Sequence, residues 1–126
     1  MQSLEELEVQ RKELKETRDC AIVSFAQASG NNYKSVAKLS YKLGRKKGHK
    51  TCWYVVGKLA RKFKMKYVPY KRMQSKNFLK DVEFVKKPII VSVRGHMFAV
   101  KEGKAMLNRE YCGWEKSLVR GYYIKK

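Results

Sequence analysis

The ten residues CAIVSFAQAS, at positions 20–29, decide the fold of this chain. In a helical conformation they are apolar on nearly every side, and Gly30 directly after them is a typical C-cap. A helix of this kind cannot lie on a surface, because its outward face would remain exposed to water. We therefore expect residues 20–29 to form a short helix in the centre of the fold.

Three further helices are predicted around this central one, over residues 3–18, 33–43 and 52–64. Each has apolar residues at the three- and four-residue spacing that is typical of a helix with one buried face. Ser3 and Glu6 form a capping box at the start of the first. The residues that share one face are Leu4, Leu7, Arg11 and Leu14 in the first helix, the apolar face of the second is Tyr33, Val36, Leu39 and Leu43, and the buried set of the third is Cys52, Val55, Val56, Leu59 and Phe63.

The second half of the chain reads as β-strands joined by Gly-containing turns. Pro69 places the first of these strands at a sheet edge, because proline cannot donate to a ladder. Helices first and antiparallel strands second predict the α+β class, with N-terminal helices packed on a C-terminal antiparallel sheet. The expected strands are 66–70, 88–93, 96–101, 104–108 and 118–124, and one more helix is expected at 75–85.

The charge of the chain is large and unevenly distributed. The 126 residues carry a formal net charge of +19, yet residues 1–19 contain six acids and four bases. Residues 20–80 contain sixteen Lys or Arg and no acid. We therefore divide the chain into an N-terminal amphipathic helix, residues 1–18, and an α+β domain, residues 19–126. A domain this basic repels itself, which predicts an anionic partner.

Several protein classes are excluded by the sequence. No apolar run approaches the length of a transmembrane helix, and the N-terminus lacks the basic, apolar character of a signal sequence. We expect a cytoplasmic protein. Three cysteines in such a chain predict free thiols rather than a disulfide framework. His49 and Cys52 have a spacing found in zinc sites, but a matching second pair is absent, so no metal or other cofactor is expected.

Cys20, His96 and Asn108 are the candidate catalytic residues. A thiol at a helix N-terminus lies at the positive end of the helix dipole, which favours the nucleophilic thiolate. His96 follows the Arg94-Gly95 turn and could hold the thiol proton, and Asn108 ends the next strand, where it could orient the imidazole. Packing alone would also explain a lone buried cysteine.

The order of these residues resembles the papain-like cysteine peptidase fold. Within it, the chain is most similar to the small bacteriocin-processing-peptidase-like proteins of tailed bacteriophages. The residues that carry the resemblance are Arg18-Asp19-Cys20, Ala26 to Gly30, Tyr33, Val36, Gly44 to Thr51, Gly95 to Val100 and Gly103.

The resemblance implies a cysteine peptidase or amide hydrolase that acts on an amide or isopeptide bond of a peptide or protein. Cys20 would be the nucleophile, His96 the general base and then acid, and Asn108 the residue that orients His96. It also implies a phage origin, with a location in the host cytoplasm or the virion. The family has a Gln five intervening residues before the Cys, whose amide stabilises the oxyanion. Here that position is Leu14, and the nearest Gln is Gln10.

A basic surface is the rival functional site. The Lys and Arg residues of 34–62 suit a phosphate backbone, and the aromatic residues Trp53, Tyr54, Tyr67 and Tyr70 among them suit stacking on unpaired bases. The alternative function is therefore a non-catalytic protein that reuses this scaffold to bind RNA, DNA, a nucleoprotein assembly or an acidic host protein. Membrane binding is disfavoured, because the basic helices lack a bulky apolar face. The candidate binding residues are Lys34, Lys38, Lys42, Arg45, Lys46, Lys47, Lys50, Lys58, Arg61 and Lys62.

Overall fold

The computed structural model describes residues 2–106 and 117–126, and the side chains of all of these except 71–73. Helices come first and strands follow, as the sequence predicts. The helices are α1 (Leu4–Glu13), α2 (Cys20–Ser29), α3 (Tyr33–Lys42), α4 (Trp53–Lys62) and α5 (Ser75–Asp81). The strands are β1 (Met65–Gln74), β2 (Ile89–Val93), β3 (His96–Lys101), β4 (Lys104–Ala105) and β5 (Leu118–Lys125).

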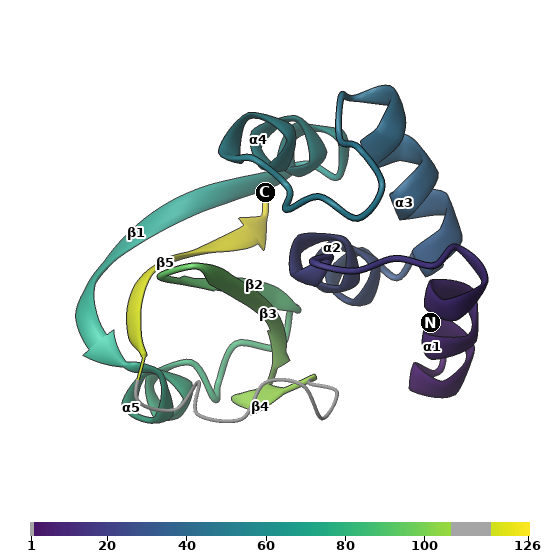
Figure 1. The fold of residues 1–126 in the computed structure, drawn as a ribbon. Coiled ribbons are helices and arrows are strands. Elements are labelled where there is room, and N and C mark those ends of the chain that lie inside the picture. The colour runs from purple at the N-terminus through teal and green to yellow at the C-terminus, as the bar shows by residue number, and fades with distance from the viewer. Residues whose placement is uncertain (1, 107–116) are drawn as a thin grey trace.

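Helix α2 is the centre of the fold, as its all-round apolar character predicts. It lies between the sheet and the group formed by α1, α3 and α4 (Figure 1). Ile22 and Phe25 are completely buried, and Gly30 ends the helix in the left-handed conformation. The predicted bounds of this helix, residues 20–29, are confirmed.

The five strands form one antiparallel sheet in the order β1-β5-β2-β3-β4. Successive residues of β2 point to opposite faces, so Ile90 packs with α2 while Ile89 and Val91 pack in a second core with Phe78 of α5. The α+β class with an antiparallel sheet is confirmed. The strand that contains Pro69 lies at a sheet edge, as predicted, but it extends over 65–74, and its pairing with β5 shifts register beyond Pro69.

Helix α1 is shorter than predicted. It ends at Glu13 instead of continuing to residue 18, and Lys15 and Arg18 take positive φ values of 53° each. The helix shares the core of α2, α3 and α4 through the buried Leu7. The turned segment, residues 14–19, brings two acids into the interior, because the side chains of Glu16 and Asp19 are both buried.

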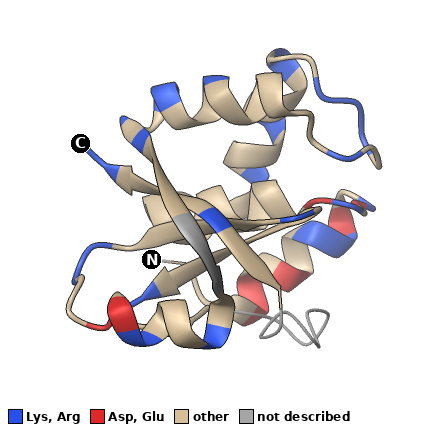
Figure 2. Ribbon diagram, turned by 90° about the vertical axis from the view of Figure 1, so that its left-hand side faces the viewer, with Lys and Arg blue, Asp and Glu red and all other residues tan. Residues whose placement is uncertain are grey.

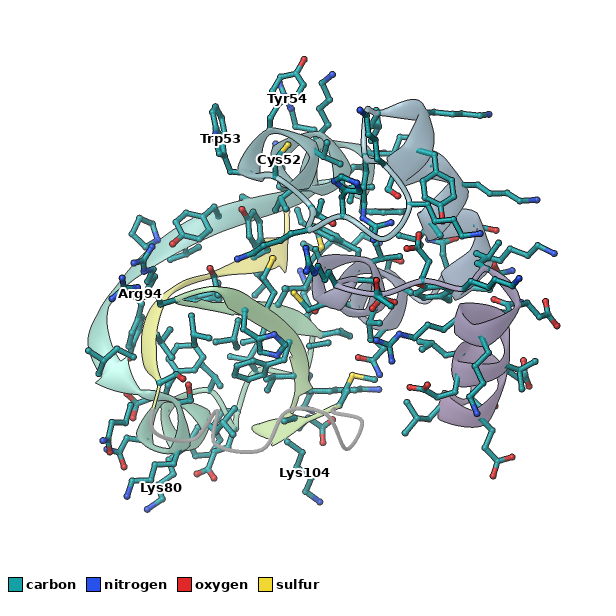
Figure 3. All side chains as sticks on the ribbon, in the orientation of Figure 1. Cys52, Trp53, Tyr54, Lys80, Arg94 and Lys104 are labelled. Atoms are coloured by element: carbon teal, nitrogen blue, oxygen red, sulfur yellow. The ribbon has the colours of Figure 1, made fainter. Side chains whose placement is uncertain are left out.

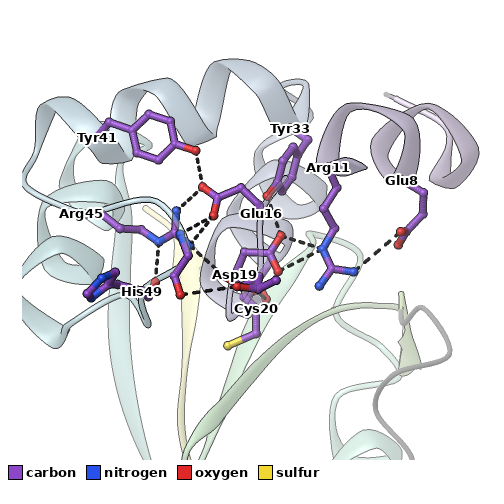
Figure 4. A network of polar contacts seen from close by, with 12 residues as sticks. Glu8, Arg11, Glu16, Asp19, Cys20, Tyr33, Tyr41, Arg45 and His49 are labelled. Carbon is purple, nitrogen blue, oxygen red and sulfur yellow. Dashed lines mark hydrogen bonds and ion pairs between the residues drawn. The ribbon is translucent and has the colours of Figure 1, made fainter. Parts of the chain in front are cut away.

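Glu16 forms a buried ion pair with Arg45 (Figure 4). The guanidinium donates to the two carboxylate oxygens over 2.6 and 3.1 Å, and neither side chain is exposed. Tyr41 and the backbone N–H of Gly48 also donate to the same carboxylate. The prediction that Arg45 belongs to a basic binding surface is therefore wrong, because its charge is neutralised inside the protein.

The same guanidinium shapes the loop between α3 and α4. Its other donors reach the carbonyl oxygens of His49 and Thr17, over 3.0 and 3.2 Å. The loop, residues 43–52, is therefore tied to the segment that leads into α2. No helix of the described residues is both long and apolar enough to cross a membrane.

We expect the Glu16 to Arg45 pair to be a major source of stability. Glu16→Gln keeps the shape of the side chain but leaves a buried guanidinium without its counter-charge, which costs about 3–5 kcal/mol of unfolding free energy. Urea denaturation followed by circular dichroism measures the change. Glu13→Gln, at an exposed position on α1, is the matched control and should change stability by less than about 0.5 kcal/mol. Equal loss in both variants would contradict the anchoring role.

The pair also makes the protein sensitive to acid. Burial alone would raise the pKa of Glu16, but the hydrogen bonds from Arg45, Tyr41 and Gly48 outweigh it and lower the pKa from 4.5 to about 2. A carboxylate whose pKa is lowered by folding stabilises the protein above its unfolded pKa and loses this effect as the pH falls. The stability difference between wild type and Glu16→Gln should therefore shrink between pH 4.5 and about pH 2.

Candidate active site

Cys20 is the first residue of α2, and Asp19 is its N-cap. Arg11 holds the Asp19 carboxylate with its Nε, over 3.0 and 2.8 Å, and the Tyr33 hydroxyl donates to it over 2.5 Å. These contacts fix the backbone immediately before the thiol. The Cys20 sulfur points away from this network, and the thiol is partly buried (Figure 4).

His96 is the first residue of β3, after the Arg94-Gly95 turn in which Gly95 has a φ of 73°. The alternation of the strand places its side chain on the face of Phe98, and the two rings stack with centroids 6.1 Å apart and 23° between their planes. Burial is the main cause that lowers the pKa of His96, and the positive charge of Lys50 lowers it further. The imidazole is thus held neutral, in the form that accepts a proton.

Cys20 and His96 come together at the end of the sheet, where both line two adjacent hollows of about 200 and 230 Å³. Lys50 and Gly95 also line both hollows. Both predicted residues therefore line the same hollows, although 76 positions separate them in the chain. The His96 ring lies on the Phe98 face of the sheet, while α2 packs on the opposite face. Asn108, the third predicted member, lies outside the described residues.

The thiol at rest is protonated. Burial raises the pKa of Cys20, while a hydrogen bond with the Met97 backbone and the charge of Lys50 act in the opposite direction without cancelling the effect of burial. The backbone at the start of α2 does favour the thiolate, through Ala21, but burial outweighs this effect. A nucleophile of this kind needs a base that takes the proton as it attacks.

Lys50 lines this site, although the sequence predicts it as part of the basic binding surface. Its side chain reaches the turn before β3, so that its Nζ lies 3.9 Å from the position that a Cβ at Gly95 would occupy. It is a charge that acts on both Cys20 and His96. The local sequence around Lys50, a basic loop with Gly44 and Gly48, does not predict this position. The position depends on how Arg45 folds the loop.

The amide donor of the papain-like family is missing from the site. Leu14 packs against the first core, and the Gln10 side chain is engaged at the start of α3, where it accepts from the backbone N–H of Lys34 over 2.9 Å. Arg11 and Arg18 are the side chains that line the hollow on this side of Cys20. Neither Leu14 nor Gln10 therefore supplies the amide that the family's Gln provides.

The predicted basic surface consists mostly of accessible residues on α3, α4 and the loop between them (Figure 2). Acids are absent from 20–80, and those of the described residues lie on α1 and the segment after it, in the region of α5, and in the turn after β3. Trp53 and Tyr54 project from the start of α4 (Figure 3), and Lys58 Nζ lies 4.0 Å from the centre of the Tyr54 ring. The exposed or partly exposed bases are Lys34, Lys38, Lys42, Lys46, Lys47, Lys50, Lys58, Arg61 and Lys62.

The other thiols play no part in the described site. Cys52 is an exposed N-cap of α4, so the prediction that it belongs to the core is wrong. Cys112 lies outside the described residues. Within the described ranges, no group of three or more His, Cys, Asp or Glu side chains is placed to hold a metal ion.

Comparisons of the chain with protein-family models, curated proteins and solved structures find no match. The resemblance to papain-like peptidases therefore depends on the residues quoted for it.

We expect Lys50→Gln to raise the pKa of both His96 and Cys20, because the ammonium disfavours imidazolium and favours thiolate. NMR titration of the imidazole protons measures the first change, with His49→Ala to assign the signals. The pH dependence of Cys20 alkylation measures the second. Lys46→Gln, in the same loop but outside both hollows, is the control, and an unchanged His96 titration in Lys50→Gln would contradict the placement of Lys50.

Proposed function

We propose that the protein is a papain-like thiol hydrolase that cleaves an amide or isopeptide bond of a peptide or protein. The observation that carries this proposal is the pair of hollows shared by Cys20 at the start of α2 and His96 at the start of β3. The resemblance adds a phage origin and a location in the host cytoplasm or the virion to the proposal. Asn108 is proposed to orient His96, as the resemblance implies.

The chemistry begins from a neutral thiol and a neutral imidazole. His96 takes the Cys20 proton as the sulfur attacks the carbonyl carbon, and the carbonyl oxygen becomes an oxyanion. The imidazolium then gives this proton to the leaving nitrogen as the carbon–nitrogen bond breaks, which leaves a thioester on Cys20. Water, deprotonated by His96, hydrolyses the thioester and restores the thiol.

Charge that develops on the oxyanion has to be stabilised without the family's Gln. The first N–H groups of α2 have no partner within the helix, and they point toward the helix start where Cys20 lies. Lys50 adds a full positive charge at the same place. One such donor is typically worth about 10²–10³ in rate, so these groups decide whether the site turns over at a useful rate.

Hydrolysis should depend on Cys20 and His96 and on no other thiol. A fluorogenic library of peptide amides, and an isopeptide-linked pair, would be incubated with wild type, Cys20→Ala, His96→Ala and Cys52→Ser. We expect Cys20→Ala and His96→Ala to lose about 10³-fold or more, while Cys52→Ser, at an exposed position, keeps the wild-type rate.

Alkylation decides the case in which no library member is cleaved. In the hydrolase, His96→Ala should slow the modification of Cys20 by iodoacetamide at neutral pH and leave that of the exposed Cys52 unchanged, because the protonated Cys20 thiol needs the imidazole to take its proton. Modification of Cys20 at a rate that His96→Ala leaves unchanged would contradict the hydrolase, as would cleavage that survives Cys20→Ala.

A second candidate function is the binding of single-stranded nucleic acid without catalysis. It is favoured by the aromatic residues at the start of α4. Trp53 is 84% exposed there, and the Lys58 ammonium lies over the Tyr54 ring in a cation–π contact. Aromatic rings next to Lys and Arg suit stacked bases and phosphates. An acidic host protein would neutralise the same Lys and Arg charges, but it would not supply bases to stack on Trp53 and Tyr54.

Binding should weaken when the Trp53 ring is removed. We expect Trp53→Ala to reduce the affinity for a labelled single-stranded oligonucleotide by about 5- to 100-fold, measured by fluorescence anisotropy, and the affinity to fall between 50 and 200 mM salt. Phe84→Ala is the matched control, because Phe84 is 82% exposed beyond α5. Absence of binding at low salt, or equal loss in both variants, would contradict this function.

A further inference from the structure

The two hollows beside Cys20 are lined by more cations than acids. The cations that line them are Arg11, Arg18 and Lys50, and Asp19 is the acid. Asp19 is only 1% exposed, and Arg11 holds its carboxylate through two hydrogen bonds. Arg11 and Asp19 therefore neutralise each other.

Arg18 and Lys50 remain as uncompensated charges. The described residues place no carboxylate within ion-pair distance of either. Arg18 is held in the left-handed conformation, with a φ of 53°, which a residue other than glycine adopts only where its surroundings impose it. The segment that imposes it is anchored on both sides, by Glu16 and by Asp19.

A buried hydroxyl lies in the lining of the first hollow. Thr51 is 9% exposed, and its Oγ1 has no hydrogen-bond partner among the described residues. Buried hydroxyls normally find a partner, because leaving one unsatisfied is costly. A hydroxyl, an ammonium and a guanidinium around one thiol are all donors, and they suit a ligand group that carries accepting oxygens and a negative charge.

We propose that this cleft selects peptides with an acidic side chain next to the bond that Cys20 attacks, and that Lys50 and Arg18 recognise its carboxylate. This inference rests on Cys20 being the nucleophile of the proposed function. The hollows are small, about 200 and 230 Å³, so each accommodates a side chain. Lys50 is common to both hollows, which allows the carboxylate to lie on either side of the thiol.

Iodoacetate and iodoacetamide test the selection without a known substrate. Both are attacked by the Cys20 thiolate, which forms a carbon–sulfur bond and displaces iodide, and they differ in charge while their shapes are nearly the same. The ratio of their second-order rate constants cancels the fraction of thiolate and the accessibility of the sulfur. The protein used carries Cys52→Ser and Cys112→Ser, and the reference ratio is that of the same chain unfolded in urea.

We expect the folded protein to favour iodoacetate by about three- to tenfold relative to the unfolded reference, and to lose this preference in about 1 M salt. Lys50→Gln and Arg18→Gln should each reduce the ratio by about twofold or more. Lys46→Gln, a cation of the same loop that lines neither hollow, should leave it unchanged. A parallel measurement compares kcat/KM for peptides that carry Glu or Gln beside the cleaved bond.

The outcomes separate this inference from the proposed function. Alkylation that depends on His96, with a ratio equal to the unfolded reference, would overturn the selection and leave the hydrolase intact. A raised ratio that Lys46→Gln lowers as much as Lys50→Gln would show a general effect of net charge, and would also overturn it. Alkylation by both reagents that His96→Ala leaves unchanged speaks against the hydrolase, yet the ratio still decides whether the cleft attracts a carboxylate.

Discussion

The buried ion pair between Glu16 and Arg45 is the interaction on which the rest of the site depends. Removing two opposite charges from water is favourable only if each satisfies the other, and here the remaining donors and acceptors are filled by Tyr41, Gly48 and the carbonyl of His49. The pair joins the segment before α2 to the loop before α4. Those two pieces of chain carry Cys20 and Lys50, which line the same two hollows.

The sequence predicts those parts of the fold that depend on local pattern. The bounds of α2 and the hairpin of β2 and β3 follow from an apolar run and from the Arg94-Gly95 turn, which are both short-range signals. The end of α1 could not be predicted in this way. Residues 14–18 have helical spacing, and the positive φ values of Lys15 and Arg18 arise from contacts with residues far along the chain.

The candidate site shows the same division. Cys20 and His96 were found because each is adjacent to a local structural signal, a helix start and a tight turn, and the fold brings them to the same hollows. Arg45 and Lys50 were both read as surface cations. Only the partner of Arg45, 29 positions earlier in the chain, distinguishes a buried anchor from a solvated loop residue, and the role of Lys50 follows from that anchor.

The position of Lys50 constrains what its charge can do for the chemistry. Transfer of the proton from thiol to imidazole creates a negative and a positive charge together, and a cation that acts on both stabilises one as it destabilises the other. Lys50 therefore contributes little to forming the Cys20 and His96 ion pair. In the proposed hydrolase, its effect would appear when a further negative charge enters the cleft, either a substrate carboxylate or the oxyanion of the tetrahedral intermediate. In the proposed hydrolase, the positive charge of Lys50 would therefore act mainly on the substrate carboxylate and the oxyanion, and little on the thiol itself.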